Sequence, residues 1–422
     1  MPQKSASNCY SLQMHVIIIS PTQALAARLP EVLARPDLLI DVIGSTHGQL
    51  AESPFINEYK NICERPKDFA STLIAQPELL NNLGEWIIFD DDELMRILAT
   101  SDLPQSTKIR ILPAKTELGL GMLGSKVGQT IAALEAGIST PQTYIARTDL
   151  EMQKYAKELC GPFVIKADLG GGGGLVRKFN SPEELESLQD REKFLPGVIQ
   201  EFISSLPFSV EALFVNGRLA AFILSEMLTC APTSFGPSDI RKFVDPSNSE
   251  IEDSLNKLAS VGGLHGFANI TFVWCQKRQM HLLIECDMRV NTWVQFGPLL
   301  GVPWGVILAD WSPTREVVTT NLGDTGRVIH LYPRTIQSGF LAEPRKRLLP
   351  WITNASGTWD TRNHIDPAVN AAERRQVSPL GLTRGTVFRP AQKAWNALPI
   401  NVTGPIERRG LKKIGLRLFG IH

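Results

Sequence analysis

Five consecutive glycines follow an apolar segment: Gly170, Gly171, Gly172, Gly173 and Gly174. The preceding residues 163–167 have the composition of a β-strand and include Lys166. Glycine loses more backbone entropy on folding than any other residue, so this run would weaken an ordinary hairpin. It suits a loop whose N–H groups approach phosphate oxygens closely. A floppy surface turn is the alternative, but Lys166 just before the glycines favours phosphate. No Gly-Lys-Ser/Thr ends the run, so it is not a P-loop.

A second polar cluster ends an apolar segment about a hundred residues later, where residues 282–289 read Leu-Leu-Ile-Glu-Cys-Asp-Met-Arg. Side chains at i and i+2 of a strand face the same side, so Glu285 and Asp287 are predicted to point together. Two acids at the end of a central strand are costly unless they are paired or bind a metal, and carboxylates suit Mg²⁺. Arg289 adds a fixed cation with bidentate geometry for an anion. A half-exposed strand with its polar residues outward is the alternative.

The composition predicts a globular protein of several domains. The chain has 422 residues, which suggests two or three domains. It has 43 basic and 43 acidic residues, so we predict no nucleic-acid partner. Its six cysteines form no CxxC pair, which argues against a zinc site and fits a reducing compartment. No apolar run reaches about 18 residues and the polar start lacks the shape of a signal peptide, so we predict a cytoplasmic protein.

Residues 1–115 are predicted to form an α/β domain with an open sheet. Strands are expected at 15–20, 39–43 and 86–89, and a helix at 22–33. No GxGxxG follows the first strand, which counts against a dinucleotide site there. The acidic run from Asp90 to Glu93 is interpreted as a helix N-cap in preference to a metal cluster.

Residues 116–325 are predicted to form a two-lobed α+β domain. The small lobe, about 116–200, contains a helix at 125–138 and the hairpin around the glycines. The large lobe, about 201–325, begins near a strand at 198–203 and contains two hairpins, one of them turning at Asn216-Gly217. A Pro/Gly-rich loop at 230–242 is interpreted either as lining a substrate site with Arg241 and Lys242 or as a solvated loop. Residues 326–422 form a C-terminal extension.

The order of these motifs resembles that of the ATP-grasp superfamily over about 200 residues. The N-terminal domain resembles the one that precedes this fold in biotin carboxylase and the D-alanine–D-alanine ligases. The resemblance implies that Lys126 and Lys166 bind phosphate and that the five glycines cover it. It implies an adenine-binding hinge at Gln200, Glu201, Phe202 and Ile203. It also implies metal ligands at Glu285, Asp287 and Asn269, with Arg289 and Lys166 as catalytic residues.

Four positions depart from the family pattern. Asp287 stands where asparagine is common, and Asn269 replaces an acid while keeping an oxygen donor. Met288 replaces the proline that precedes the arginine. Pro207 lies near the usual place of a ribose-binding acid, so Glu211 is expected to bind the ribose.

The resemblance implies an ATP-dependent ligase that joins a carboxylate to an amine through an acyl phosphate. The implied cofactors are ATP and Mg²⁺, with Mn²⁺ as an alternative, and the implied partners are small-molecule carboxylates and amines. Two other functions stay open: a degenerate scaffold that binds ATP without turnover, and a nicotinamide-dependent oxidoreductase, which the missing glycine fingerprint disfavours. A homodimer is also left open.

The end of the chain is basic. Residues 405–422 contain five basic residues and Glu407, a net charge of +4. Leu411, Ile414 and Leu418 recur at helical spacing, although glycines interrupt the pattern. The segment is interpreted either as a docking tail or as a weak contact with anionic membrane at the cytoplasmic face.

Overall fold

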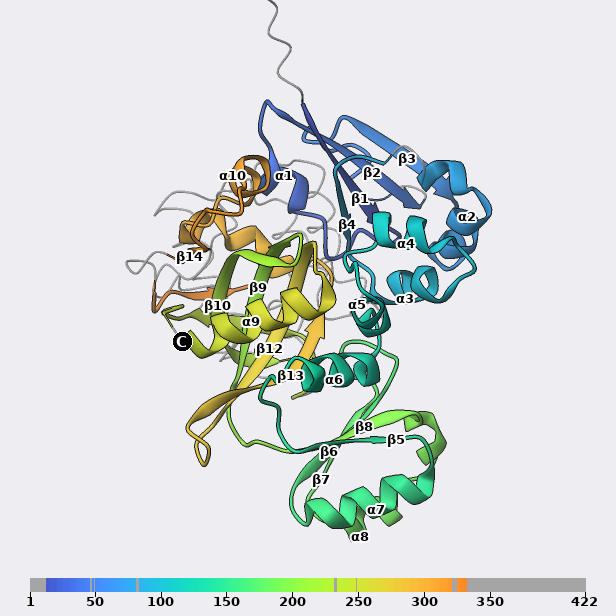
Figure 1. The fold of residues 1–422 in the computed structure, drawn as a ribbon, viewed down its shortest axis with the longest axis vertical. Coiled ribbons are helices and arrows are strands. Elements are labelled where there is room, and N and C mark those ends of the chain that lie inside the picture. The colour runs from blue at the N-terminus through green and yellow to red at the C-terminus, as the bar shows by residue number, and fades with distance from the viewer. Residues whose placement is uncertain are drawn as a thin grey trace, which may run out of the picture.

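The computed structural model describes residues 13–331, apart from 46–47, 49, 81–82, 231–233, 248 and 321–324. Figure 1 shows an N-terminal sheet at the top, a large sheet in the middle and a small sheet at the bottom. The predicted α/β domain followed by a two-lobed α+β region is confirmed. No helix in the described part of the chain is both long and apolar enough to span a membrane. The basic segment 405–422 lies outside the described residues.

The N-terminal sheet is parallel, with strand order β3-β2-β1-β4. Its strands are β1 (Met14–Ser20), β2 (Leu38–Ser45), β3 (Glu58–Cys63) and β4 (Trp86–Phe89). Helices cover both faces, which explains the continuous β-branched run of β1. Strand β3 was not predicted, because as an edge strand it has a polar sequence and remains partly exposed.

The helix predicted at 22–33 is wrong for most of its length, because the chain forms a loop until α1 (Leu29–Leu33). Gln23 has a left-handed φ of 57°, which ends helical geometry at that point. Its backbone N–H donates to Ser20 Oγ at 2.8 Å, and its side chain is buried. The other helices of this domain are α2 (Phe69–Ala75), α3 (Asp92–Thr100) and α4 (Gln105–Ile111), with 3-10 turns η1 (Pro66–Asp68) and η2 (Pro77–Leu80).

The small lobe is an antiparallel sheet of order β5-β8-β6-β7. Its strands are β5 (Thr143–Ala146), β6 (Phe163–Ala167), β7 (Val176–Phe179) and β8 (Gly197–Glu201). Its helices are α7 (Asp149–Leu159) and α8 (Pro182–Glu186), with the 3-10 turn η3 (Arg191–Phe194). Before this sheet come α5 (Glu117–Met122) and α6 (Lys126–Glu135), which pack on the large lobe.

The large sheet has the order β13-β12-β9-β10-β11-β15, with β14 pairing β10. Its strands are β9 (Pro207–Val215), β10 (Arg218–Cys230), β11 (Ser238–Phe243), β12 (Gly266–Cys275), β13 (Met280–Asp287), β14 (Val318–Thr319) and β15 (Val328–His330). The other elements are α9 (Ser249–Gly262), η4 (Thr292–Phe296), η5 (Pro298–Leu300) and α10 (Trp304–Asp310). The two predicted hairpins are present as β9–β10 and β12–β13.

Two apolar cores join the N-terminal domain to the large lobe, one on each face of the N-terminal sheet. The first contains Ile17 and Phe89 together with Phe214 and Phe272 of the large sheet. The small lobe instead buries a core of its own around Phe163 and Ile199. The strand β15 belongs to the large sheet, so a domain boundary at 325 would separate it from its partner β11.

Candidate active site

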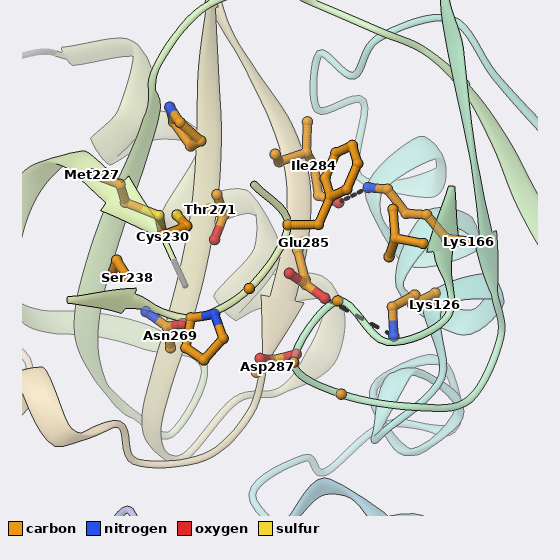
Figure 2. A pocket seen from close by; sticks show the side chains of 18 of the residues that line it. Lys126, Lys166, Met227, Cys230, Ser238, Asn269, Thr271, Ile284, Glu285 and Asp287 are labelled. Carbon is orange, nitrogen blue, oxygen red and sulfur yellow. Dashed lines mark hydrogen bonds and ion pairs between the residues drawn. The ribbon is translucent and has the colours of Figure 1, made fainter. Parts of the chain in front are cut away.

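A cavity of about 1480 Å³ lies where the N-terminal domain and the two lobes meet. In Figure 2, Lys126 and Lys166 lie on one side of it, and Met227, Cys230 and Ser238 lie on the other. Glu285 and Asp287 project between them from β13. All five glycines of the loop after β6 also line the cavity. The fold therefore brings together the glycine loop, the lysines and the paired carboxylates.

Lys166 spans the gap between the lobes. Its Nζ donates to Gln200 Oε1 on β8 and to the backbone oxygen of Ile284 on β13, both at 2.9 Å. Burial lowers the pKa of Lys166 to about 8, with Glu285 opposing and Lys126 adding to this shift. An anion entering the cavity would stabilise the charged ammonium.

Lys126 is the first residue of α6 and faces the glycine loop. Its Nζ donates to the Gly170 oxygen at 2.6 Å and lies 4.0 Å from Glu285 Oε1. Gly173 comes close to the opposite wall, where a β-carbon on it would lie 2.1 Å from the Phe235 oxygen. Its φ of +73° also favours glycine. The loop therefore contacts both walls of the cavity through its backbone.

Arg289 follows β13 and holds two carboxylates. Its Nη2 donates to Asp287 Oδ2 at 2.6 Å, and its Nε donates to Asp92 Oδ2 on α3. Burial opposes the charge on Arg289, but Asp287 and Asp92 outweigh burial and raise its pKa. Burial raises the pKa of Asp287, with Arg289 opposing and Asp92 and Glu285 adding to the rise. The site thus gathers three acids beside Arg289, and Lys126 lies 4.0 Å from one of them, Glu285.

The segment after β8 forms one edge of the cavity. The N–H groups of Glu201 and Phe202 donate to Gln142 and Pro162 oxygens, both at 2.8 Å. The Glu201 carboxylate pairs with Arg278 at 2.5 Å, so it is turned toward the β12–β13 hairpin. The Ile203 N–H has no hydrogen bond within the described residues, which leaves this donor available at the cavity edge.

Comparisons with known proteins agree with this geometry. Residues 125–292 match the family model described as the ATP-grasp domain. The structure is similar to N5-carboxyaminoimidazole synthetase from Staphylococcus aureus complexed with ADP, with 12% identity, a TM-score of 0.58, and coverage of 79% of this chain and 87% of that one. Residues 125–292 therefore form an ATP-grasp domain.

Two further solved structures have similar folds. The biotin carboxylase domain of the Hydrogenobacter thermophilus 2-oxoglutarate carboxylase, solved with MgADP and bicarbonate, shows 16% identity and a TM-score of 0.55, covering 74% of this chain and 73% of that one. The L-amino acid ligase from Bacillus licheniformis shows 14% identity and a TM-score of 0.51, covering 70% and 73%. A search of curated protein sequences finds no match.

The structure does not bring Glu211 into the cavity. Glu211 is 2% exposed and its Oε1 accepts from Arg241 Nη1 at 2.7 Å. Asn269 Nδ2 donates to the same Oε1 at 2.8 Å and to Ser209 Oγ at 2.8 Å. Because its nitrogen is used in this way, Asn269 has its amide oxygen left for a ligand in the cavity. We therefore withdraw the ribose contact predicted for Glu211 and keep the metal contact predicted for Asn269.

Glu211→Gln is expected to lower the free energy of unfolding by about 3 kcal/mol, because it removes the charge that pairs with the buried Arg241 at 2.7 Å. Denaturant unfolding measures this change. Glu58→Gln, at an exposed position of β3, is the control and should change stability by less than about 0.5 kcal/mol. A variant with normal stability but weakened ATP binding would restore the ribose assignment.

The segment 230–242 was predicted as a loop, and this is wrong from residue 238 on. Ser238–Phe243 is β11, which pairs with both β10 and β15. Arg241 is 2% exposed and its guanidinium lies over the Trp293 ring at 4.4 Å. It lines the cavity as half of an ion pair with Glu211, whereas Lys242 is absent from the lining.

Two site residues were missed by the sequence analysis. Asp168 Oδ1 accepts from Ser125 Oγ at 2.7 Å and from the Val127 N–H at 2.9 Å, which fixes the start of α6 beside the glycine loop. Asp92 belongs to the acidic run that was interpreted as a cap. Asp91 does cap α3, accepting from the Leu94 N–H at 2.7 Å, but Asp92 reaches Arg289. Ser125 before the helix was a local signal for Asp168, but no local pattern indicated that Asp92 contacts Arg289.

Proposed function

We propose that this protein is an ATP-dependent ligase that joins a carboxylate to an amine through an acyl phosphate. The observation that carries the proposal is the cleft itself. Lys126, Lys166 and the glycine loop face Glu285 and Asp287 of the large lobe. Similar structures carry ADP or MgADP, which supports the same use of the cleft here.

The cleft provides separate groups for the base and the phosphates of ATP. We assign the adenine to the edge formed by residues 200–203, where backbone groups and the Ile203 N–H are the polar contacts. Apolar side chains at this edge, Val164, Val273 and Ile284, would cover the base. Lys126, Lys166 and the loop N–H groups would neutralise the phosphates, because fixed donors in a partly buried site interact strongly with developing charge.

The residues present fit Mg²⁺ brought in with ATP. The described residues contain no group of three or more His, Cys, Asp or Glu side chains placed to hold a metal by themselves. Mg²⁺ in such enzymes is usually held by one or two carboxylates, waters and the phosphates of the substrate. Glu285, Asp287 and the Asn269 oxygen provide that smaller set. When bound, the ion would neutralise phosphate charge during transfer.

The protein promotes the reaction by positioning the substrate carboxylate next to the terminal phosphate of ATP. Arg289, held by Asp287 and Asp92, would orient the substrate carboxylate beside the terminal phosphate. A carboxylate oxygen attacks the γ-phosphorus, the bond to the bridging oxygen breaks, and ADP leaves. The amine nitrogen then attacks the acyl carbon, phosphate leaves, and the amine proton passes to solvent. The product is an amide and the net reaction consumes one ATP.

ADP release with hydroxylamine as the amine tests the proposal, because hydroxylamine traps acyl phosphates as hydroxamates. We expect ADP formation to depend on Mg²⁺ and on an added carboxylic acid, with hydroxamate detected by mass spectrometry. Calorimetry measures ATP affinity in parallel. ATP binding without ADP release from any acid would identify a scaffold without turnover, and absent ATP binding would refute the proposal.

A further inference from the structure

The far end of the cavity lies between the N-terminal domain and the large lobe. The Val290 N–H donates to the Phe89 oxygen at 3.0 Å, which joins the end of β4 to the segment after β13. Figure 1 shows β13 running toward the N-terminal domain. This link brings the acids that follow Phe89 close to Arg289, which binds both Asp92 and Asp287.

Some residues that line this cavity have buried polar atoms without hydrogen-bond partners. Within the described residues, four buried side-chain atoms without a hydrogen-bond partner belong to residues that line this cavity. Two are acceptors, Asp90 Oδ1 and Asp92 Oδ1, and two are donors, Arg289 Nη1 and Trp293 Nε1. Such atoms are costly in a folded protein, so their clustering in one cavity calls for a ligand that satisfies them.

Asp90 is a buried acid that forms no ion pair within the described residues. It is 4% exposed, and its Oδ2 accepts from Ser20 Oγ at 2.6 Å and from the Ala26 N–H at 3.4 Å. No basic side chain in the described part of the chain forms an ion pair with it. Burial raises the pKa of Asp90 to about 6, with Ser20 opposing the rise. Asp91 adds to the rise, and a ligand ammonium group would stabilise the buried Asp90 carboxylate.

The two donors, Arg289 Nη1 and Trp293 Nε1, could bind an anion. Trp293 is 1% exposed in η4, and its indole N–H has no partner among the described residues. Arg289 has one guanidinium nitrogen left after its bonds to Asp287 and Asp92. A carboxylate accepts well from both kinds of donor. This end of the cavity thus offers donors for an anion and an acceptor for a cation.

The geometry points to a site for a zwitterionic amino acid, whose carboxylate lies at Arg289 and Trp293 and whose ammonium lies at Asp90. This inference rests on the proposed ligase function and adds the class of the acyl donor to it. Arg289 adjoins Asp287, so the carboxylate is the end that faces the phosphates of ATP. The amino acid is therefore the substrate that is phosphorylated, and the second amine is supplied by another molecule.

Phosphorylation of the amino acid needs ATP as its only other reactant. An oxygen of the amino acid carboxylate forms a bond to the γ-phosphorus, the bond from that phosphorus to the bridging oxygen breaks, and ADP leaves with the electron pair. Hydroxylamine then forms a bond to the acyl carbon through nitrogen. Phosphate leaves, a proton is lost to solvent, and the amino acid hydroxamate remains.

The test compares acyl donors with the full-length protein, ATP, Mg²⁺ and hydroxylamine. Each of the twenty standard L-amino acids is assayed, together with acetate, propionate and succinate. For each active amino acid, two derivatives are also assayed: the N-acetyl derivative, which lacks the ammonium, and the amide, which lacks the carboxylate. We expect hydroxamate from at least one amino acid, at least tenfold less from its N-acetyl derivative, and none from the amide.

Two variants connect this selectivity to the site. Asp90→Asn keeps an acceptor for Ser20 but loses the charge, and Trp293→Phe keeps a ring but loses the N–H. Each is expected to raise the KM for the amino acid at least tenfold while leaving the Kd for ATP unchanged. Asp102→Asn and Trp274→Phe, which lie outside the cavity lining, are the matched controls. Circular dichroism and thermal unfolding identify a variant that fails to fold. If one of the two variants fails to fold, the KM of the other one tests the site.

The outcomes separate this inference from the proposed function. Hydroxamate from plain or N-acetylated acids at the rate seen with amino acids, or from other acids but from no amino acid, overturns the amino acid site. Calorimetry of the amino acids with a non-hydrolysable ATP analogue covers the case in which no acid reacts. If an amino acid binds and Asp90→Asn abolishes that binding, the site is supported although the ligase reaction fails. If no acid reacts and no amino acid binds, the site and the ligase reaction are both refuted.

Discussion

Glu285→Gln is expected to reduce ATP turnover about a thousandfold, because the site loses a charged group that acts on the transferring phosphate. The Glu285 side chain is 40% exposed, so the variant should unfold at nearly the wild-type temperature. ADP release at saturating ATP and acid measures the effect, and circular dichroism checks the fold.

Asp287 provides a matched pair of variants at the same site. Asp287→Ala is expected to lose turnover to a similar extent, because Arg289 then has Asp92 alone and a second oxygen ligand is gone. Asp287→Asn keeps an oxygen in the form common in ATP-grasp relatives, so it should retain activity within about tenfold of the wild type. Equal loss in both variants would show that the charge and not the oxygen is required. Full activity in Asp287→Ala would refute the proposed metal site.

Lys166→Met is expected to weaken ATP binding between about tenfold and a hundredfold, the size of a charge-assisted hydrogen bond to phosphate. The residual bound complex should also turn over about a hundredfold more slowly, because one fixed cation is missing. Methionine keeps the packing of the side chain, and burial disfavours the ammonium in the free protein. The variant should therefore unfold at the same or a higher temperature.

The pH dependence of ATP binding gives a second check on Lys166. With a pKa of about 8 in the free protein, Lys166 is protonated below pH 8 and neutral above it. Phosphate prefers the protonated form, so ATP affinity should fall as pH rises above 8 in the wild type but not in Lys166→Met. Calorimetry from pH 7 to 9.5 measures this slope, with exposed Lys157→Ala as the control. The same slope in Lys166→Met would assign the proton to another group.

Local sequence patterns were sufficient for the elements that form the nucleotide end. Alternating side chains place Glu285 and Asp287 together on β13, and an apolar strand with a glycine run places Lys166 beside the loop. The turn at Asn216-Gly217 has positive φ at both residues, as this pair favours. These features depend on residues within a few positions of one another, so a single sequence contains the information.

Tertiary structure decided the rest, because the deciding contacts join distant segments. The sequence places Asp92 at the start of a helix, and only docking of the N-terminal domain brings it to Arg289, 197 residues away. Glu211 was expected at the nucleotide, but packing of β9 between β10 and β12 buries it against Arg241 and Asn269. A buried charge pairs with whichever partner the packed sheet places beside it. The chain by itself determined the chemistry of the cleft, and the packing of its three parts determined which of those groups can face a substrate.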